Sequence, residues 1–295
     1  MGIKKDTTNT RRLGDKLERR FIPEVESVLK ELGTVPLRDI EGAIRSGVDV
    51  YVEALPSEAF EDDLRASIAG HSGATIDASS KLALTQLPKG ARFKFDLFSR
   101  NITDYVAKNA ANKVVGIANE TRLAIRETVK DGLNKGLDPR TIAKRVRPQI
   151  GLNTVQARAN NNYFLEQFDK LTSQGVSGAK AEAKAGERAI RKAKQQVRSR
   201  SLTISRTETF AGISKGRQET WKQGMDRGYI PRKAKKGWRN TGDNFVRDSH
   251  RDVFPVPVGS MFRLGSGVST QGPGLSGVGS EDINCRCVTY LIYEG

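Results

Sequence analysis

The sequence predicts a mainly α-helical protein in which helical bundle modules fill the N-terminal two thirds and a small α+β domain with a long glycine-rich loop follows. Apolar residues recur at spacings of three and four through the first 170 residues, which is the period of one helix face. After about residue 229 this period stops, and glycine, proline and serine separate short apolar runs. With 295 residues, 37% of them hydrophobic and 28% charged, the chain has room for two or three domains with a sizeable core.

The first module is predicted to contain three amphipathic helices and to end at residue 70. Their apolar stripes are Leu13, Leu17, Phe21, Val25, Val28 and Leu32, then Leu37, Ile40, Ile44, Val48 and Tyr51, then Phe60, Leu64 and Ile68. Pro23 marks a kink or a restart in the first of them. Glycine and serine become frequent over 71–91, which predicts a linker after an N-terminal docking module over 1–70.

A second helical module is predicted over 92–177. Its first apolar stripe runs from Phe95 and Phe98 to Val129 and breaks near Gly132. Asp138-Pro139 is a helix start, because an aspartate can cap the helix and a proline needs no N–H in the first turn. Asn153 or Thr154 is expected to cap one more helix.

Residues 178–230 predict a basic helix and a following helix. The basic helix carries cations spaced along one face, with only Glu182 and Glu187 to offset them: Lys180, Lys184, Arg188, Arg191, Lys192, Lys194, Arg198 and Arg200. Lys233, Lys235 and Lys236 form a second cluster in the last segment, 231–295. These cations predict either contacts with nucleic-acid phosphates or a solvent-exposed helix face.

The net charge of +16 lies in the last two thirds of the chain: residues 1–100 have a net charge of 0, residues 101–200 of +11 and residues 201–295 of +5. A partial basic excess is typical of a polyanion partner, and nucleic acid is the first expectation. No apolar stretch approaches the ~20 residues of a membrane span, and no secretory signal is visible. Two cysteines are too few to staple a fold of this size, which favours a reducing compartment.

The last third holds the densest set of unusual residues. In chain order they are Arg206, Thr207, Glu208, Trp221, Trp238, Asp243, Arg247, His250, Phe262, Asn284, Cys285, Arg286 and Cys287. Their order over about 175–290 resembles the phage head morphogenesis family, the Mu F-type minor head proteins of tailed phages, and Asn-Cys-Arg-Cys is its most specific element. The chain departs from that family at Phe254-Pro255, where an acidic-glycine turn is frequent.

The resemblance implies a minor capsid protein that is associated with the portal and contributes to head assembly, DNA packaging or DNA ejection. Its partners would be the phage portal protein, packaged double-stranded DNA, and the major capsid or a scaffolding protein. It would lie inside the virion near the portal vertex, and in the host cytoplasm during assembly. No catalytic activity is established for the family, so we expect a protein that is not an enzyme and requires no cofactor.

Cys285, Cys287 and His250 are candidate zinc ligands. The two cysteines point to one face of an extended segment, and a fourth ligand could come from Asp243, Asp248 or Asp252. The alternative is a pair of reduced cysteines packed as small hydrophobes.

Catalytic pairings of His250 with Asp248, Asp252 or Cys285 are less favoured, because no substrate pocket or phosphate-binding motif accompanies them. Arg206 and Glu208 are expected to anchor their helix to the strand and loop region, and Trp221 and Trp238 to lie in the core.

Two other functions remain open. One is a free, non-specific DNA-binding protein, and the other is a metal-dependent nuclease or toxin-like enzyme.

Overall fold

A computed structural model describes residues 3–32, 35–46, 57–87 and 93–293. The chain divides into two compact units, each assembled from separate stretches. The C-terminal unit comprises Met1–Ile22, Ser67–Asn109 and Leu202–Gly295, and the helical unit comprises Pro23–Ala66 and Ala110–Ser201.

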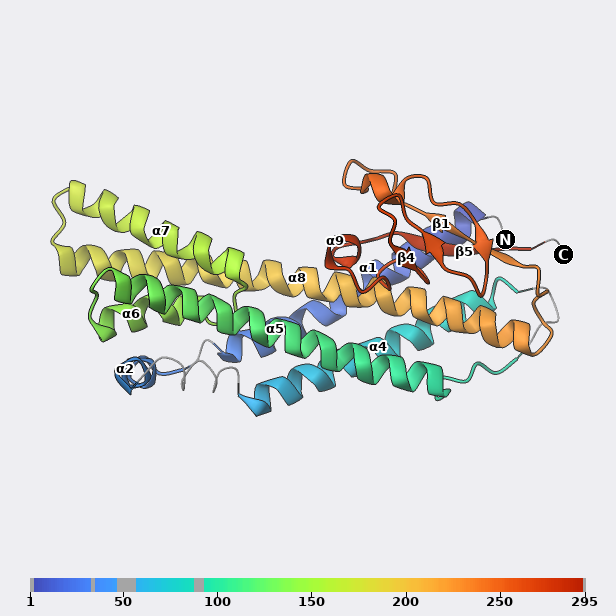
Figure 1. Cartoon of the computed structure of the whole chain (residues 1–295), viewed down its shortest axis with the longest axis horizontal. Coiled ribbons are helices and arrows are strands. Elements are labelled where there is room, and N and C mark those ends of the chain that lie inside the picture. The colour runs from blue at the N-terminus through green and yellow to red at the C-terminus, as the bar shows by residue number, and fades with distance from the viewer. Residues whose placement is uncertain (1–2, 33–34, 47–56, 88–92, 294–295) are drawn as a thin grey trace. The chain divides into compact units, whose positions relative to one another are not determined.

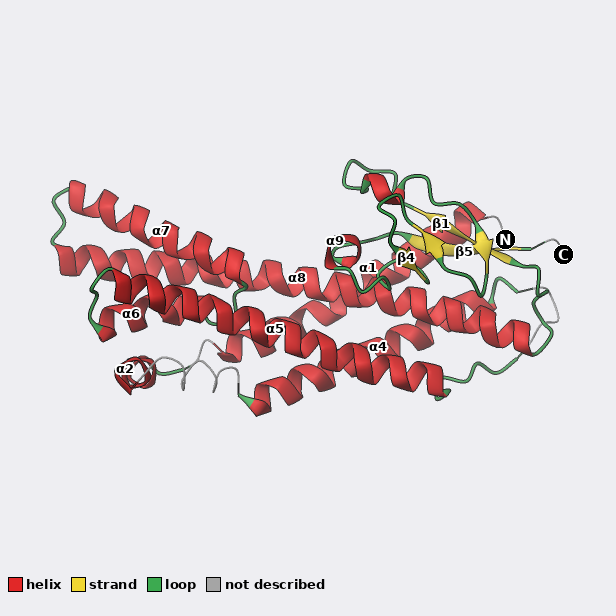
Figure 2. Cartoon of the chain, viewed as in Figure 1, coloured by secondary structure: helices red, strands yellow, loops and turns green. Residues whose placement is uncertain are grey.

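The predicted fold class is confirmed (Figures 1 and 2). The described helices before the C-terminal region are α1 (Ile3–Leu32), α2 (Leu37–Ser46), α4 (Glu58–Leu84), α5 (Arg100–Asn134), α6 (Pro139–Val146), α7 (Thr154–Ser173) and α8 (Gly178–Asp226). The C-terminal region adds β1 (Lys235–Arg239), β2 (Val256–Pro257), β3 (Phe262–Arg263), β4 (Ser269–Thr270), α9 (Gly279–Asp282) and β5 (Val288–Ile292). Short 3-10 turns, η1 (Arg147–Gln149) and η2 (Asp248–His250), complete the described elements.

The predicted linker over 71–91 is wrong in its first part, because α4 continues through it to Leu84. Its serine hydroxyls bond to carbonyls within the helix, as Ser80 Oγ does to Asp77 O at 2.8 Å. Its small side chains also allow a close helix crossing, in which Ser79 Oγ donates to Ile213 O of α8 at 3.1 Å. Residues 88–92 lie outside the described residues, as do Val48 and Tyr51.

The predicted helix starts are confirmed where a capping side chain is present. Asp138 accepts hydrogen bonds from the N–H groups of Arg140 and Thr141, and Pro139 occupies the first turn of α6. Asn153 caps α7 with a reciprocal capping box to Gln156. The predicted start at Phe95 is wrong, because α5 begins at Arg100 and Phe98 is exposed.

The predicted basic helix and following helix are one helix of 49 residues, α8. Its first half buries a stripe of alanines, Ala181, Ala185, Ala189 and Ala193, in the helical unit. Its second half crosses the C-terminal unit, where Trp221 is fully buried beside Ile230 and Val258. Trp221 is therefore a core residue, as predicted.

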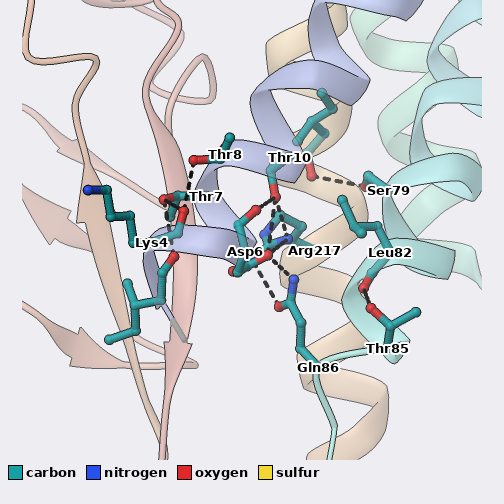
Figure 3. Close-up of polar contacts among 12 residues, drawn as sticks. Lys4, Asp6, Thr7, Thr8, Thr10, Ser79, Leu82, Thr85, Gln86 and Arg217 are labelled. Carbon is teal, nitrogen blue, oxygen red and sulfur yellow. Dashed lines mark hydrogen bonds and ion pairs between the residues drawn. The ribbon is translucent and has the colours of Figure 1, made fainter. Parts of the chain in front are cut away.

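In the C-terminal unit, α8 is tied to the first half of α1 by a buried polar network (Figure 3). Arg217 is completely buried, and its Nη2 donates to Asp6 Oδ2 at 2.7 Å. The same guanidinium donates to Thr10 Oγ1 at 2.9 Å and to Gln86 Oε1 at 3.0 Å. A buried charge needs such partners, because leaving it unpaired costs several kcal/mol.

The strands of the C-terminal unit form a small antiparallel sheet in the order β2-β1-β5 and a hairpin of β3 and β4. In the sheet, Trp238 of β1 is opposite Thr289 of β5. The predicted terminal strand from Val288 is therefore confirmed. The predicted glycine-rich loop contains the β3–β4 hairpin, which packs Phe262 against Trp238 with ring centroids 5.4 Å apart.

Candidate metal centre and basic helix face

The C-terminal unit brings His250, Cys285 and Cys287 together in its second core cluster. His250 ends η2, and its ring meets Trp238 edge-on at a centroid distance of 5.1 Å. Asn284, at φ +60°, turns the chain from α9 toward β5 and places the two cysteines just before that strand.

All three side chains of this His-Cys-Cys cluster are buried, and both Sγ atoms lie 3.7 Å from His250 Nδ1. Their ligand atoms lie within 4.8 Å of one another. The predicted grouping is confirmed, and the cluster could hold a metal ion.

Glu281 completes the arrangement from the other side of the imidazole. Its Oε2 lies 2.9 Å from His250 Nε2 and accepts a hydrogen bond from Ser249 Oγ at 2.8 Å. A carboxylate on one ring nitrogen fixes the proton there and leaves the other nitrogen free to bind a metal, an arrangement that accompanies most metal-binding histidines. Glu281 therefore orients Nδ1 toward the two sulfur atoms.

Sequence reasoning missed Glu281. The expected acidic partners of His250 were Asp248 and Asp252, its near neighbours in sequence. Asp248 instead points to solvent and pairs with Arg251, and Asp252 is exposed. Glu281 follows a glycine- and serine-rich loop whose path no local pattern specifies, so its approach to His250 depends on the tertiary fold.

The charges in the cluster are coupled. Burial alone lowers the pKa of His250, but the hydrogen bond and negative charge of Cys285, with Glu281, outweigh it and raise that pKa. The hydrogen bond from Cys287, with that of His250, lowers the pKa of Cys285 against the effect of burial. The same bond and burial raise the pKa of Cys287. The cluster thus favours a Cys285 thiolate beside a protonated His250. A metal cation can take the place of the protons that these ligand atoms hold.

No aspartate joins the three ligands among the described residues, contrary to the expected fourth ligand. A pocket of about 40 Å³ borders the cluster, and Asp243 and Arg247 line it. The Asp243 carboxylate accepts the N–H of Phe245 at 3.0 Å. The pocket has room for a water molecule, which needs about 10–15 Å³.

The remaining motif residues hold α8, α1 and the cysteine turn together. Thr207 Oγ1 accepts the N–H of Asn284 at 3.1 Å, and Arg206 reaches Asn284 Oδ1 at 3.5 Å. Arg206 also pairs with Glu18 of α1 at 3.1 Å. The anchoring role predicted for Arg206 is confirmed.

Three further contacts complete this frame. Glu208 accepts a hydrogen bond from Asn109 of α5 at 2.6 Å. Arg247 donates to Ile283 O at 2.6 Å, and Arg286 pairs with Asp15 of α1.

The predicted cations of α8 do not share one environment. Lys180, Lys184, Arg191 and Arg198 are all exposed and fall within about 40° of one another around the helix axis, along about 27 Å of its length. We call this set the basic face. Glu187 is exposed beside it.

Arg188 and Lys192 turn instead toward α7. Arg188 Nη1 donates to Gln167 Oε1 at 2.5 Å, and Lys192 Nζ lies 4.2 Å from the centre of the Tyr163 ring. Lys194 lies next to the basic face, about 40° around the helix axis from Arg198, and lines an apolar groove.

Two predicted nucleic-acid contacts are wrong because their side chains are buried. Arg200 is 4% exposed, and it donates to Gly151 O and to Glu120 Oε2, both at 2.8 Å. Lys236 is completely buried, and its Nζ donates to Gln218 Oε1 at 2.9 Å and to Gln271 O at 2.8 Å. Both cations stabilise the interior, whereas Lys233 and Lys235 remain exposed.

Comparison with known proteins gives a partial similarity. The chain is 34% identical over 97 residues to the NAD(+)–arginine ADP-ribosyltransferase EFV of Enterococcus faecalis (strain ATCC 700802 / V583). The matched stretch is 32% of this chain, and it spans about a fifth (19%) of the length of that relative. No family model matches the chain, and no solved structure matches it.

This comparison contradicts the expectation that the chain is not an enzyme, because the similar protein is named for an enzymatic activity. The expectation of no enzymatic activity came from the resemblance to the head morphogenesis family. That resemblance rested on the order of the motif residues, and motif order does not exclude an enzymatic activity. Among the described residues, no helix is long and apolar enough to cross a bilayer.

Proposed function

We propose that the chain is a minor head protein of the phage head morphogenesis type, which binds the portal protein and contacts packaged DNA inside the virion. The observation that carries the proposal is the convergence of the motif residues. Arg206, Thr207 and Asn284 connect α8 to the turn that presents Cys285 and Cys287 beside His250. A motif spread over some 80 residues thus forms one framework.

DNA contact is proposed for the basic face. Its four cations are exposed along about 27 Å of one helix, so they can approach successive phosphates of a duplex. Binding would be independent of sequence, because a row of lysines and arginines reads the backbone and not the base edges. The same property would also serve a free DNA-binding protein, so DNA binding alone does not support a virion role.

Zinc is the metal proposed for the His-Cys-Cys cluster. Two thiolates and an imidazole are ligands that zinc prefers, and the carboxylate behind the imidazole is the usual outer partner. Bound zinc would supply a cross-link between η2 and the turn before β5, in a domain whose strands are short. The test is the zinc content of the purified full chain, expected at one ion per chain and lost in Cys285→Ser and Cys287→Ser. Asp248→Asn, next to the site but pointing to solvent, is the control.

The proposed function is tested by co-purification with the portal protein of the same phage. We expect the complex to persist after nuclease treatment and at about 0.5 M salt, where exposed charges are strongly screened. The same result is expected for the variant Lys184→Ala/Arg191→Ala/Arg198→Ala, which removes most of the basic face. If the complex disappears with nuclease and in that variant, DNA was the bridge and the free DNA-binding function replaces the proposal.

A second candidate function comes from the name of the similar protein: transfer of ADP-ribose from NAD⁺ to arginine. We would incubate the full chain with labelled NAD⁺ and a small guanidino acceptor, with heat-denatured chain as the control. Label on the acceptor would establish this activity for the chain. Its absence, under conditions in which the Enterococcus protein is active, would exclude this activity for the chain.

A further inference from the structure

An apolar groove lies on the surface of the helical unit. It has a volume of about 400 Å³ and is bordered by the end of α1, the η1 turn and α8. Its lining includes Leu29, Pro148, Ile150, Ile190 and Val197. Ile190 is 38% exposed there.

The floor of the groove is built rigidly. Gly151 has φ +89°, and a Cβ at this position would lie 2.8 Å from Leu29 O, so only glycine allows the turn to approach α1. The buried Arg200 then holds the turn, because it donates to Gly151 O at 2.8 Å and to Ile117 O at 3.3 Å. The groove is therefore formed before any ligand binds, which is typical of binding sites.

Cations surround the apolar lining. Lys30, Arg147 and Lys194 line the groove, and none of its described lining residues is acidic. Lys30 pairs with Glu26 at 2.6 Å, whereas Arg147 and Lys194 are exposed and form no ion pair with a described residue. The groove thus presents a net positive field around a surface that favours aliphatic side chains.

This chemistry differs from that of the basic face. Ile190 and Val197 lie about 80–100° around the helix axis from Arg198. Lys194 lies between them and the basic face, about 40° from Arg198 and about 60° from Arg191. A DNA backbone offers phosphates but no aliphatic groups to fill an apolar groove. An acidic amphipathic helix offers both, with leucine-like side chains toward the groove and carboxylates toward its cations.

We propose that this groove binds an acidic amphipathic helix of a partner protein. Apolar side chains at helical spacing would enter between Leu29, Ile150 and Ile190, and flanking carboxylates would meet Arg147 and Lys194. Lys194 then belongs to a protein-binding surface and not to the DNA-binding face. The proposal does not depend on the nature of the function proposed above.

The test uses two labelled 14-residue peptides with the full-length chain, followed by fluorescence anisotropy. One peptide has leucines on one helix face and glutamates elsewhere, and the other has the same composition with the leucines distributed around the helix. We expect the first to bind at least about tenfold more tightly. Lys194→Glu and Ile190→Glu should each weaken its binding by about tenfold or more.

Arg191→Glu is the matched control, because it makes the same charge change on the neighbouring face of the same helix. It should change peptide binding by less than about twofold and weaken binding of a short DNA duplex by about tenfold. Circular dichroism verifies that the variants keep their helices.

Three results would overturn the proposal. They are equal binding of the two peptides, equal effects of Lys194→Glu and Arg191→Glu on peptide binding, and no peptide binding up to about 1 mM. Concentration-dependent dimerisation that is lost in Ile190→Glu would show that the groove binds a second copy of the chain instead.

Discussion

Glu281 is the carboxylate that contacts His250 in the candidate metal centre. It does not touch the cysteines, yet its carboxylate lies 2.9 Å from His250 Nε2 and so decides which ring nitrogen carries the proton. Burial alone raises the pKa of Glu281, but hydrogen bonds from Ser266 and Ser249 and the charge of His250 outweigh it and lower that pKa. The carboxylate is thus ionised and able to hold His250 in the metal-binding tautomer.

Replacing Glu281 by glutamine should weaken zinc binding by about 10- to 100-fold, because the amide is a poorer partner for the imidazole. The measurement is competition with a chromophoric zinc chelator. Ser249→Ala, which removes only one hydrogen bond to the carboxylate, should have a smaller effect. An unchanged zinc affinity in Glu281→Gln would mean that Glu281 has no part in metal binding.

Lys236 should make stability depend on pH in the alkaline range. Burial lowers its pKa from 10.5 to about 8. Below pH 8 Lys236 is charged in both the folded and the unfolded chain. Burying that charge lowers the free energy of unfolding by about 3 kcal/mol. Between pH 8 and 10.5 the unfolded chain binds more protons than the folded chain, so the free energy of unfolding rises with pH.

Urea unfolding of the wild type and of Lys236→Met at pH 7 to 10 measures this difference. The wild type should gain stability relative to the variant as pH rises. A constant difference between the two proteins would show that the pKa of Lys236 is not lowered.

Helix α8 packs closely against α4 because a small residue lies at their crossing point. A Cβ on Gly216 would lie 2.1 Å from Ser79 Oγ and 2.7 Å from Ile76 O of α4. The crossing of α4 and α8 in the C-terminal unit therefore requires glycine at this position. At Gly186, on the same helix, an added Cβ would meet nothing within 4 Å.

Gly216→Ala should consequently destabilise the protein by about 1–3 kcal/mol through overpacking, despite the better helix propensity of alanine. Gly186→Ala is the matched control and should stabilise by up to about 1 kcal/mol. Urea unfolding followed at a helical signal measures both. Equal stabilisation by the two substitutions would contradict the close crossing.

The sequence predicted elements well where one local signal decides them. The caps at Asp138 and Asn153 and the buried stripe of Phe21, Val25 and Val28 are such cases. Prediction from sequence failed where tertiary contacts determine the local structure. Glycine and serine over 71–84 were interpreted as a linker because the helix α8 that they pack against is more than 100 residues away in sequence.

The candidate site was predicted to a similar extent. The ligands His250, Cys285 and Cys287 could be named, because they are rare residue types that stand out in composition. The burial of Arg200 and Lys236 could not be predicted, since a basic run has the same sequence whether a side chain points outward or inward.

In the whole molecule, the chain passes between the two units four times, at 22/23, 66/67, 109/110 and 201/202, and each passage lies inside a helix. The units are therefore not joined by a linker, and the predicted division into consecutive modules does not match the two units. The C-terminal unit needs the first half of α1, which supplies Asp6 to Arg217 and Asp15 to Arg286.

A fragment of residues 202–295 should therefore not fold alone, because the buried Arg217 would lose its partner, at a cost of about 3–5 kcal/mol. Adding a separate fragment of residues 1–201 should restore its structure, as judged by dispersion of the amide signals in an NMR spectrum. A well-dispersed spectrum of the isolated fragment 202–295 would contradict this dependence.

The pairing of α1 with residues 202–295 also sets a delay during translation. The ribosome must synthesise the roughly 180 residues between Ile22 and Leu202 before α1 can meet the first of its late partners. At about 5–20 residues per second, this takes about 9–36 s. Throughout that time the core around Phe21 is incomplete, and slow translation prolongs the exposure of its apolar surface to aggregation.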